Sequence, residues 1–174
     1  SGPQDRDSNI FGHKPFLLLA HELTQSGIAV LRFDERGVGE SRGRISEMTM
    51  ATQMGDAQAG INYLLSNHHI NPTKIGLLGH ILGGILAPKL AIENDINFLV
   101  LLAAPGVNGD EMMLKQRKDL LKLRGATDKQ IEGTNEMLAS LYSELRKSSL
   151  EGEALKFELQ KKLAVKYQST IPEK

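Results

Sequence analysis

The chain has 174 residues, enough for one domain or slightly more with a hydrophobic core. Its 21 Lys and Arg balance its 21 Asp and Glu, so no overall charge favours nucleic acid or an anionic membrane as a partner. The chain has 0 Cys, which excludes disulfides, thiolate zinc sites and a cysteine nucleophile. No apolar run approaches the roughly 20 residues of a transmembrane helix.

Polar residues and turn formers fill the first fourteen positions, where Gly2, Pro3 and Gly12 predict a long loop. This opening has no signal peptide, and we expect a soluble protein whose compartment is left open. Because the chain starts within a loop, we also expect a truncated form of a longer bacterial protein. A helix is expected to begin at Pro15, which suits a first turn, and to end before Gly27.

A β-branched run from Ile28 to Phe33 predicts a strand, and a charged loop with two glycines follows from Asp34 to Ser41. Glycines in such a loop can cradle a phosphate, but neither G-x-x-x-x-G-K-[ST] nor a G-x-G-x-x-G between strand and helix is present. We therefore favour a structural turn held by a network between Asp34 and Arg36.

Apolar residues at helical spacing predict an amphipathic helix from Met50 to about Asn67. His68 and His69 follow its polar end. Further ligands at metal-binding spacing are not visible around them. We therefore expect no metal site and no cofactor.

The stretch from Lys74 to Gly84 combines a short apolar strand, a turn of small residues and the start of a helix. Gly79 and Gly83 flank the turn in the order Gly79-His80-Ile81-Leu82-Gly83. Such glycines are typical of a nucleophile elbow, G-x-S-x-G, in which a serine in a strained conformation forms the tip. Because Ile81 occupies the tip, the stretch is either an ordinary strand-to-helix turn or an elbow without its serine.

Helices and strands alternate from residue 15 to residue 104, where Phe98 to Ala104 forms a further apolar strand. This order predicts an α/β fold, a parallel sheet with flanking helices. After Asn108 only helical patterns remain, one of them opened by a capping box from Thr127 to Gln130. We therefore divide the chain into a partial α/β core, 1–108, and a helical segment, 109–174. The helical segment is a cap over a cleft, a dimerisation element or a solvated appendage.

Four stretches in chain order resemble landmarks of the α/β-hydrolase superfamily, with the bacterial serine-aminopeptidase-like and acyl-esterase group as the most similar. They are Ser1 to Asp7, Gly12 to Phe16, Arg32 to Ser41 and Lys74 to Gly84. The resemblance covers residues 1 to about 106. It implies a partial α/β-hydrolase core and places the helical segment as the lid insertion of that fold.

The resemblance implies hydrolysis of a small carboxylic ester or peptide-like amide by a Ser, an acid and a His in that chain order. Ser1 and Gly2 match the end of the oxyanion loop, and Leu82 matches the residue whose backbone N–H donates to the oxyanion. His80 matches a variable position of the elbow. Ile81 replaces the nucleophile. The acid and the histidine that the family carries after the lid have no counterpart in this chain.

The resemblance also implies that a strand is missing between residues 28–34 and 75–79, so we expect a homo-oligomer or completion of the sheet by another chain. Three hypotheses follow. The chain is a catalytically silent fragment of an esterase or peptidase; or a non-catalytic binding or oligomerisation module; or an enzyme that uses another nucleophile. The third is the weakest because Ser41 and the other hydroxyl groups lie away from the elbow in the sequence. Whether Ile81 is natural or engineered is left open.

Overall fold

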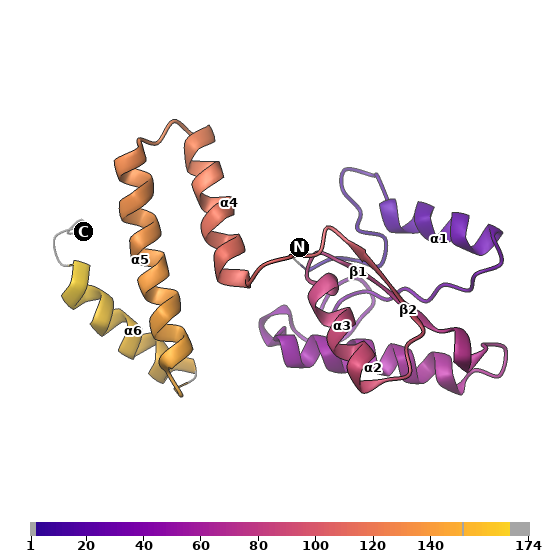
Figure 1. Ribbon diagram of the computed structural model, residues 1–174. Coiled ribbons are helices and arrows are strands. Elements are labelled where there is room, and N and C mark those ends of the chain that lie inside the picture. Colours follow the sequence, from indigo (N-terminus) through magenta and orange to yellow (C-terminus); the bar gives the residue numbers. More distant parts are fainter. Residues whose placement is uncertain (1–2, 151, 168–174) are drawn as a thin grey trace. The chain divides into compact units, whose positions relative to one another are not determined.

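The computed structural model describes residues 3–150 and 152–167, and contacts within the chain divide it into two compact units, Ser1–Pro105 and Gly106–Lys174. Figure 1 labels the helices and strands of both units. The first unit contains, in chain order, α1 (Pro15–Gln25), a 3-10 turn (Ile45–Glu47), α2 (Met50–Ser66), a second 3-10 turn (Pro72–Lys74), β1 (Gly76–His80), α3 (Gly83–Glu93) and β2 (Phe98–Leu102).

The two strands form a parallel pair in which Gly76 lies opposite Phe98 and His80 lies opposite Leu102. Helix α3 connects them and packs on both, with α2 against α3 (Figure 1). The predicted α/β class, a parallel sheet with flanking helices, is confirmed. Parallel strands require such a crossover, because a tight turn can only reverse the chain.

The strand predicted over residues 28–33 is wrong. This segment has no regular secondary structure, and in the described part of the chain it belongs to no strand ladder. A strand needs backbone partners, and the sheet of the described residues consists of β1 and β2 alone. The segment is instead held by packing, since the side chains of Leu31 and Phe33 lie against Gly60 of α2.

The first two helices begin and end where the sequence predicts. Helix α1 begins at Pro15 and ends in a Schellman motif, in which the N–H of Gly27, with φ of 81°, donates to Thr24 O and that of Ile28 to Leu23 O. Helix α2 begins with a reciprocal capping box between Thr49 and Thr52, which satisfies two backbone N–H groups.

The hydrophobic core of the first unit lies between the sheet, α2 and α3. Its buried apolar residues are Ile61, Ile75, Ala87 and Leu90, each at most 4% exposed, and Ala20 of α1 is buried as well. At the edge of this core, Gln58 of α2 and Asn94 after α3 exchange two amide hydrogen bonds of 2.8 Å. Paired amides satisfy each other's donors and acceptors, so this contact fixes α2 against the end of α3.

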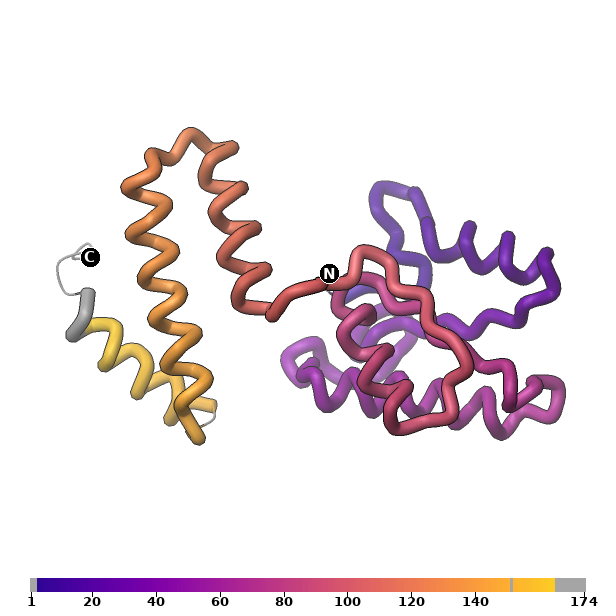
Figure 2. Tube along the Cα trace, viewed as in Figure 1, coloured from indigo at the N-terminus to yellow at the C-terminus, as the bar shows by residue number. Residues whose placement is uncertain are grey.

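The second unit consists of α4 (Gly109–Leu123), α5 (Asp128–Lys147) and α6 (Gly152–Tyr167). Figure 2 shows α5 beside both α4 and α6. Gly125 reverses the chain after α4 in a second Schellman motif, and the predicted capping box of Thr127 and Gln130 is present.

Charged pairs join the helices of the second unit. Asp110 in the first turn of α4 and Arg146 in the last turn of α5 form an ion pair, with Oδ2 and Nη2 2.8 Å apart. Each charge also interacts favourably with the dipole of its own helix. Glu144 of α5 and Lys162 of α6 form an ion pair, with Oε2 and Nζ 2.8 Å apart.

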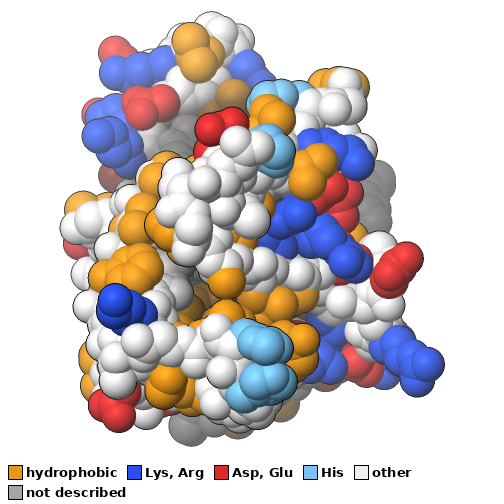
Figure 3. Space-filling view, turned by 90° about the vertical axis from the view of Figure 1, so that its right-hand side faces the viewer, with side chains coloured by type: hydrophobic (Ala, Val, Ile, Leu, Met, Phe, Trp, Pro, Cys, Tyr) orange, Lys and Arg blue, Asp and Glu red, His pale blue; other side chains and the backbone are white. Residues whose placement is uncertain are grey.

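Many apolar side chains of the first unit reach the surface. All five side chains of β2 are at least 37% exposed, and so are those of Ile28, Val30, Leu31 and Phe33. The face drawn in Figure 3 likewise carries hydrophobic side chains between charged and polar ones. Within the described residues, the structure contains no helix with the length and hydropathy needed to cross a bilayer.

Pro88 lies inside α3, which nevertheless runs unbroken from Gly83 to Glu93. Pro88 lacks the backbone N–H that would donate a hydrogen bond to the carbonyl of Gly84 one turn earlier. Replacing Pro88 by alanine should therefore raise the free energy of unfolding by about 1–3 kcal/mol in urea denaturation. Lys89→Ala on the same helix is the control and should change it little. An unchanged or lowered stability for Pro88→Ala would contradict this account of α3.

Candidate functional site

The turn between β1 and α3 has the local geometry that the sequence predicts. Ile81 follows the last residue of β1 and has φ of 52°, and Leu82 has helical angles and caps α3. The N–H of Ile81 donates to Leu102 O of β2 at 3.0 Å, and its carbonyl accepts from Gly84 N at 3.0 Å. The tip of the turn is thus fixed to the neighbouring strand on one side and to the helix on the other.

Two glycines make this turn possible, because strand and helix come very close. A Cβ on Gly79 would overlap the carbonyl of Gly83, and a Cβ on Gly84 would overlap the side chain of Ala104 beyond β2. Gly83 differs from the expectation, since a Cβ there would meet no atom within 4 Å. Only Gly79 and Gly84 of these three positions therefore require glycine for steric reasons. The backbone of Gly83 is the group that comes too close to position 79 for a Cβ there.

Ile81 holds a strained conformation. A β-branched residue with positive φ is a rare outlier, and such strain costs on the order of 1–3 kcal/mol. Ala103, with φ of 49°, turns left-handed at the end of the adjacent β2. Both parallel strands therefore end in sharp turns at the same edge of the sheet, where α/β folds place their ligands.

His80 contacts the N-terminal part of the chain. Its ring meets that of Phe16 edge to face, with the centroids 5.4 Å apart. Phe16 lies in the first turn of α1, and its N–H donates to Asp7 O. Asp7 and Phe16 are thereby connected to His80, the last residue of β1.

Ser1 and Gly2, which the resemblance assigns to the oxyanion loop, lie outside the described residues. Residues directly after them are well anchored. The backbone N–H of Gln4 donates to Glu35 Oε2, and the backbone N–H of Glu35 donates to Gln4 O, both at 3.2 Å.

The loop from Asp34 to Ser41 is a structural turn, but the predicted pairing of Asp34 with Arg36 is wrong. Asp34 is buried and binds Arg6, which donates through its backbone N–H, Nε and Nη2 at 2.7, 3.0 and 2.7 Å. The N–H of Glu40 completes this set at 3.0 Å, and the hydroxyl of Ser41 donates to Asp34 O. A planar guanidinium matches a carboxylate in this two-pronged way, which explains the preference for Arg6.

Arg36 instead binds Asp56 of α2, with Nε and Oδ2 3.1 Å apart. Two glycines let the loop fold around these pairs: a Cβ on Gly39 would overlap the carboxylate of Asp34, and one on Gly43 would overlap the side chain of Arg36. The loop therefore joins the N-terminal segment to α2.

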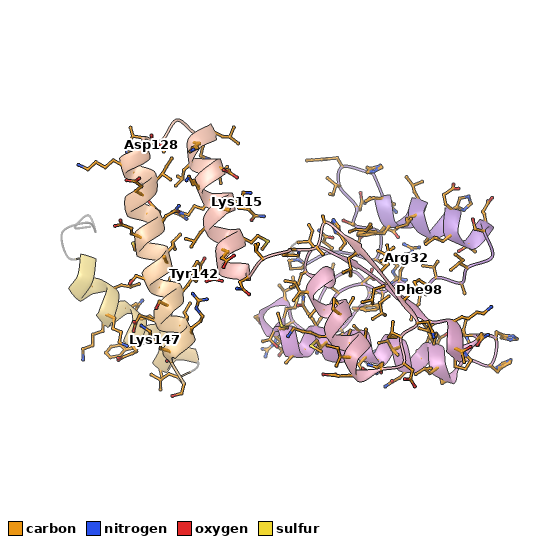
Figure 4. The ribbon with its side chains drawn as sticks, in the orientation of Figure 1. Arg32, Phe98, Lys115, Asp128, Tyr142 and Lys147 are labelled. Carbon is orange, nitrogen blue, oxygen red and sulfur yellow. The ribbon has the colours of Figure 1, made fainter. Side chains whose placement is uncertain are left out.

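A third arginine strengthens the same connection. Arg32, labelled in Figure 4, donates to the carboxylate of Asp7, which Lys14 also approaches, and to the carbonyl of Arg6. Sequence reasoning missed these pairs, although both segments were recognised as family landmarks. Asp-Arg-Asp in one segment and Arg-Phe-Asp in the other were the available signal, but contacts across 25–28 positions cannot be read from local spacing.

The pKa values of these groups follow from their partners. The hydrogen bonds from the Arg6 side chain, then those from the backbone N–H groups of Glu40 and Arg6, hold the pKa of Asp34 well below its ordinary value. Arg32 lowers the pKa of Asp7 in the same way. Burial raises the pKa of Glu35.

The remaining candidate groups have other surroundings. His21 contacts Gln25 one turn later, and the rings of His68 and His69 contact each other. Across residues 3–150 and 152–167, the structure brings together no set of three His, Asp or Glu side chains suited to a metal ion.

Comparisons with known proteins indicate the family of this chain. A family model described as serine aminopeptidase, S33, matches residues 14–155. An esterase, EstD of Thermotoga maritima, is 30% identical over 144 residues, covering 81% of this chain and 33% of its own length. An uncharacterised protein of Mycobacterium tuberculosis is 37% identical over 83 residues, covering 48% of this chain and 28% of its own length. An uncharacterised protein of Acanthamoeba polyphaga mimivirus is 37% identical over 70 residues, covering 40% of this chain and 24% of its own length. The chain spans about a third or less of the length of these relatives.

The strain at Ile81 has a measurable consequence. Asparagine tolerates positive φ, whereas threonine, like isoleucine, is β-branched and does not. Threonine and asparagine are both polar, so their comparison isolates the effect of backbone strain. Ile81→Asn should therefore be more stable than Ile81→Thr by roughly 1 kcal/mol in urea denaturation. Equal stabilities would indicate that the backbone relaxes at this position.

Asp34 should make stability depend on pH in the acid range. Because its pKa is lower in the folded chain than its ordinary value of 3.8, its stabilising effect is complete above that value and is lost as the pH falls below it. Asp34→Asn should lower the melting temperature near neutral pH, and the difference from the unmodified chain should shrink below pH 3.8. Asp7 and Glu35 are present in both proteins, so their titration largely cancels. A difference that is constant with pH would contradict the assignment.

Proposed function

Because the chain belongs to the serine aminopeptidase S33 family of the α/β-hydrolase superfamily, we propose that its β1–α3 turn is a nucleophile elbow that lacks its nucleophile. The conformation of Ile81 carries this proposal. A non-glycine residue with positive φ between a parallel strand and a closely packed helix is the arrangement in which that fold exposes its serine. An ordinary strand-to-helix turn has no need of this strain.

The oxyanion site follows from the same geometry. The first backbone N–H groups of a helix have no partner within it, so the N–H of Leu82 at the start of α3 suits an oxyanion donor. Ser1 or Gly2 supplies the second donor by resemblance. The elbow frame consists of Gly79, His80, Gly83 and Gly84. In this frame the ring of His80 packs against Phe16 and does not act as a catalytic base.

The parent reaction is hydrolysis of a small carboxylic ester or a peptide-like amide, and this chain does not catalyse it. An aliphatic side chain cannot form an acyl-enzyme. The family's base follows the lid, whereas the five histidines of this chain, His13, His21, His68, His69 and His80, all precede Ile81. Asp34 does not serve as the acid, because Arg6 and backbone N–H groups occupy its oxygens.

The helical segment, 109–174, is the lid of the partial hydrolase core, 1–108. The extent of the family match supports this role, since it continues through α4 and α5 to residue 155. Helices α4 and α5 lie within the matched region, which supports a lid over an unrelated appendage.

A second proposal is a non-catalytic module that binds an acyl ligand or associates through its sheet. The exposed apolar side chains of β2 favour it. An unpaired strand edge attracts another strand, so the partner is a second copy or another chain that completes the sheet.

The unmodified chain should not hydrolyse p-nitrophenyl acetate above the buffer rate. Ile81→Ser alone should not restore enzymatic rates, because serine needs a hydrogen-bonded base. We expect its rate to lie within about tenfold of that of the matched Ile81→Ala variant. Turnover at rates typical of enzymes by Ile81→Ser would mean that one of the histidines is a base after all.

Sedimentation should show self-association that depends on β2. Val100→Lys places a charge on the exposed strand and should lower the average mass. Ile92→Lys, at a position 86% exposed on α3, should leave it unchanged. A monomeric unmodified chain would contradict the proposed association.

A further inference from the structure

Basic side chains of the second unit gather towards the end of α4. The chain as a whole is balanced in charge, but five of the ten residues 115–124 are Lys or Arg and one is acidic. The five are Lys115, Arg117, Lys118, Lys122 and Arg124, and all are exposed, Lys115 being labelled in Figure 4. Within residues 3–150 and 152–167, their side chains form no ion pair or hydrogen bond. Their charges are therefore available to an anionic partner.

Helix α4 packs against α5 with one face. Asp110 at its start pairs with Arg146 of α5, and Leu114 and Leu121, four and eleven positions after Asp110, are partly buried. Positions with these spacings share one side of a helix, because 3.6 residues complete a turn. The packed face of α4 is therefore the side that carries Asp110, Leu114 and Leu121.

A second apolar face of α4 is exposed. Met113, Leu120 and Leu123 lie at helical spacing on a side that is roughly a third of a turn away from the packed face. Their exposed fractions are 49%, 47% and 87%. Packing within the second unit needs only one apolar face of α4, so this second face suits a surface outside that unit.

Charged residues border the exposed apolar face. By helical spacing, Arg117 and Arg124 lie along one side of it, and Asp119 lies along the other, with Lys115 and Lys122 beyond. Long cationic side chains can lay their alkyl stems on an apolar surface while their charged ends stay in a polar layer. The face thus has an apolar centre and margins that are basic except at Asp119.

A lipid surface with anionic headgroups matches this arrangement. Acyl chains cover an apolar stripe without needing a complementary shape, and anionic headgroups attract the Lys and Arg beside it. A second copy of the chain matches less well, because residues 115–124 carry the same net positive charge in both copies. Nucleic acid offers phosphates to the cations but no cover for the exposed leucines.

We propose that α4 binds in the plane of membranes that contain anionic lipid. Met113, Leu120 and Leu123 then lie at the boundary between headgroups and acyl chains, and the basic side chains lie among the headgroups. Such binding requires no helix that crosses the bilayer. It is independent of the proposed elbow, since it uses residues of α4 alone.

Flotation with lipid vesicles tests this binding in the full chain. The chain should float with vesicles of phosphatidylcholine that contain one third phosphatidylglycerol, and much less with vesicles of phosphatidylcholine alone. Added salt should weaken the binding, because it screens charges at a surface. Titration with lipid gives a partition coefficient for each variant, and circular dichroism checks that glutamine substitutions keep the helix.

Three changes on α4 separate the apolar and the charged contributions. Leu123→Gln should lower the partition coefficient on the order of tenfold, since it removes the most exposed of the three apolar side chains. Lys122→Gln combined with Arg124→Gln should lower it roughly fivefold for each charge removed. Asp119→Asn should raise it by roughly the same factor, and only on the anionic vesicles.

Matched controls lie on the other helices of the second unit. Phe157→Gln, at a position 69% exposed on α6, is the control for the apolar change. Lys129→Gln combined with Lys161→Gln, at exposed positions of α5 and α6, removes the same charge as the pair on α4. Both controls should change the partition coefficient much less than their counterparts on α4.

Four outcomes would overturn the proposal. Equal flotation with both kinds of vesicle, or equal losses in the controls, would reject α4 as the helix that recognises anionic lipid. Losses on removal of charge with no effect of Leu123→Gln would reject insertion of the apolar face. A lower average mass of Leu123→Gln in sedimentation without lipid would assign the face to a second copy of the chain.

Discussion

The close approach of α3 to the ends of β1 and β2 is the constraint on which the first unit depends. Gly79 admits the backbone of Gly83, and Gly84 admits Ala104, so the helix starts almost in contact with both strands. A chain that turns from strand to helix in so little space must pass through positive φ at the tip. Ile81 carries that strain because its neighbours, and not its own preference, determine the backbone there. The turn therefore keeps this geometry with isoleucine at its tip.

The loop after residue 33 extends this frame to distant parts of the chain. Asp34 and Arg36 stand two positions apart but bind in different directions, Asp34 to the N-terminal segment and Arg36 to α2. A loop between two other segments has few backbone hydrogen bonds of its own, so these partly buried charge pairs supply its order. Such pairs specify a unique arrangement more than they stabilise it, because the cost of desolvation offsets much of their attraction.

The apolar surface of the first unit reflects a sheet with few strands. Residues 28–33 are mostly apolar, yet the described residues include no strand with which they pair. Parallel sheets are normally covered on both faces, and here every side chain of β2 remains more than a third exposed. The region matched in EstD is 33% of its length, so that relative has more chain with which to cover such a surface. The core described here is consistent with part of a larger α/β fold.

The sequence by itself determined the elements whose signals are local. Pro15, Gly27 and the Thr127 capping box set helix ends correctly, and the glycines around Ile81 placed the turn, because caps and turns depend on residues a few positions apart. Only the tertiary structure decided the rest. Residues 28–33 had the composition of a strand, but strand formation depends on a partner elsewhere in the chain. Likewise Asp34 had a cation two positions away, and its choice of Arg6 followed from the folded path that brings a better-oriented guanidinium to a buried carboxylate.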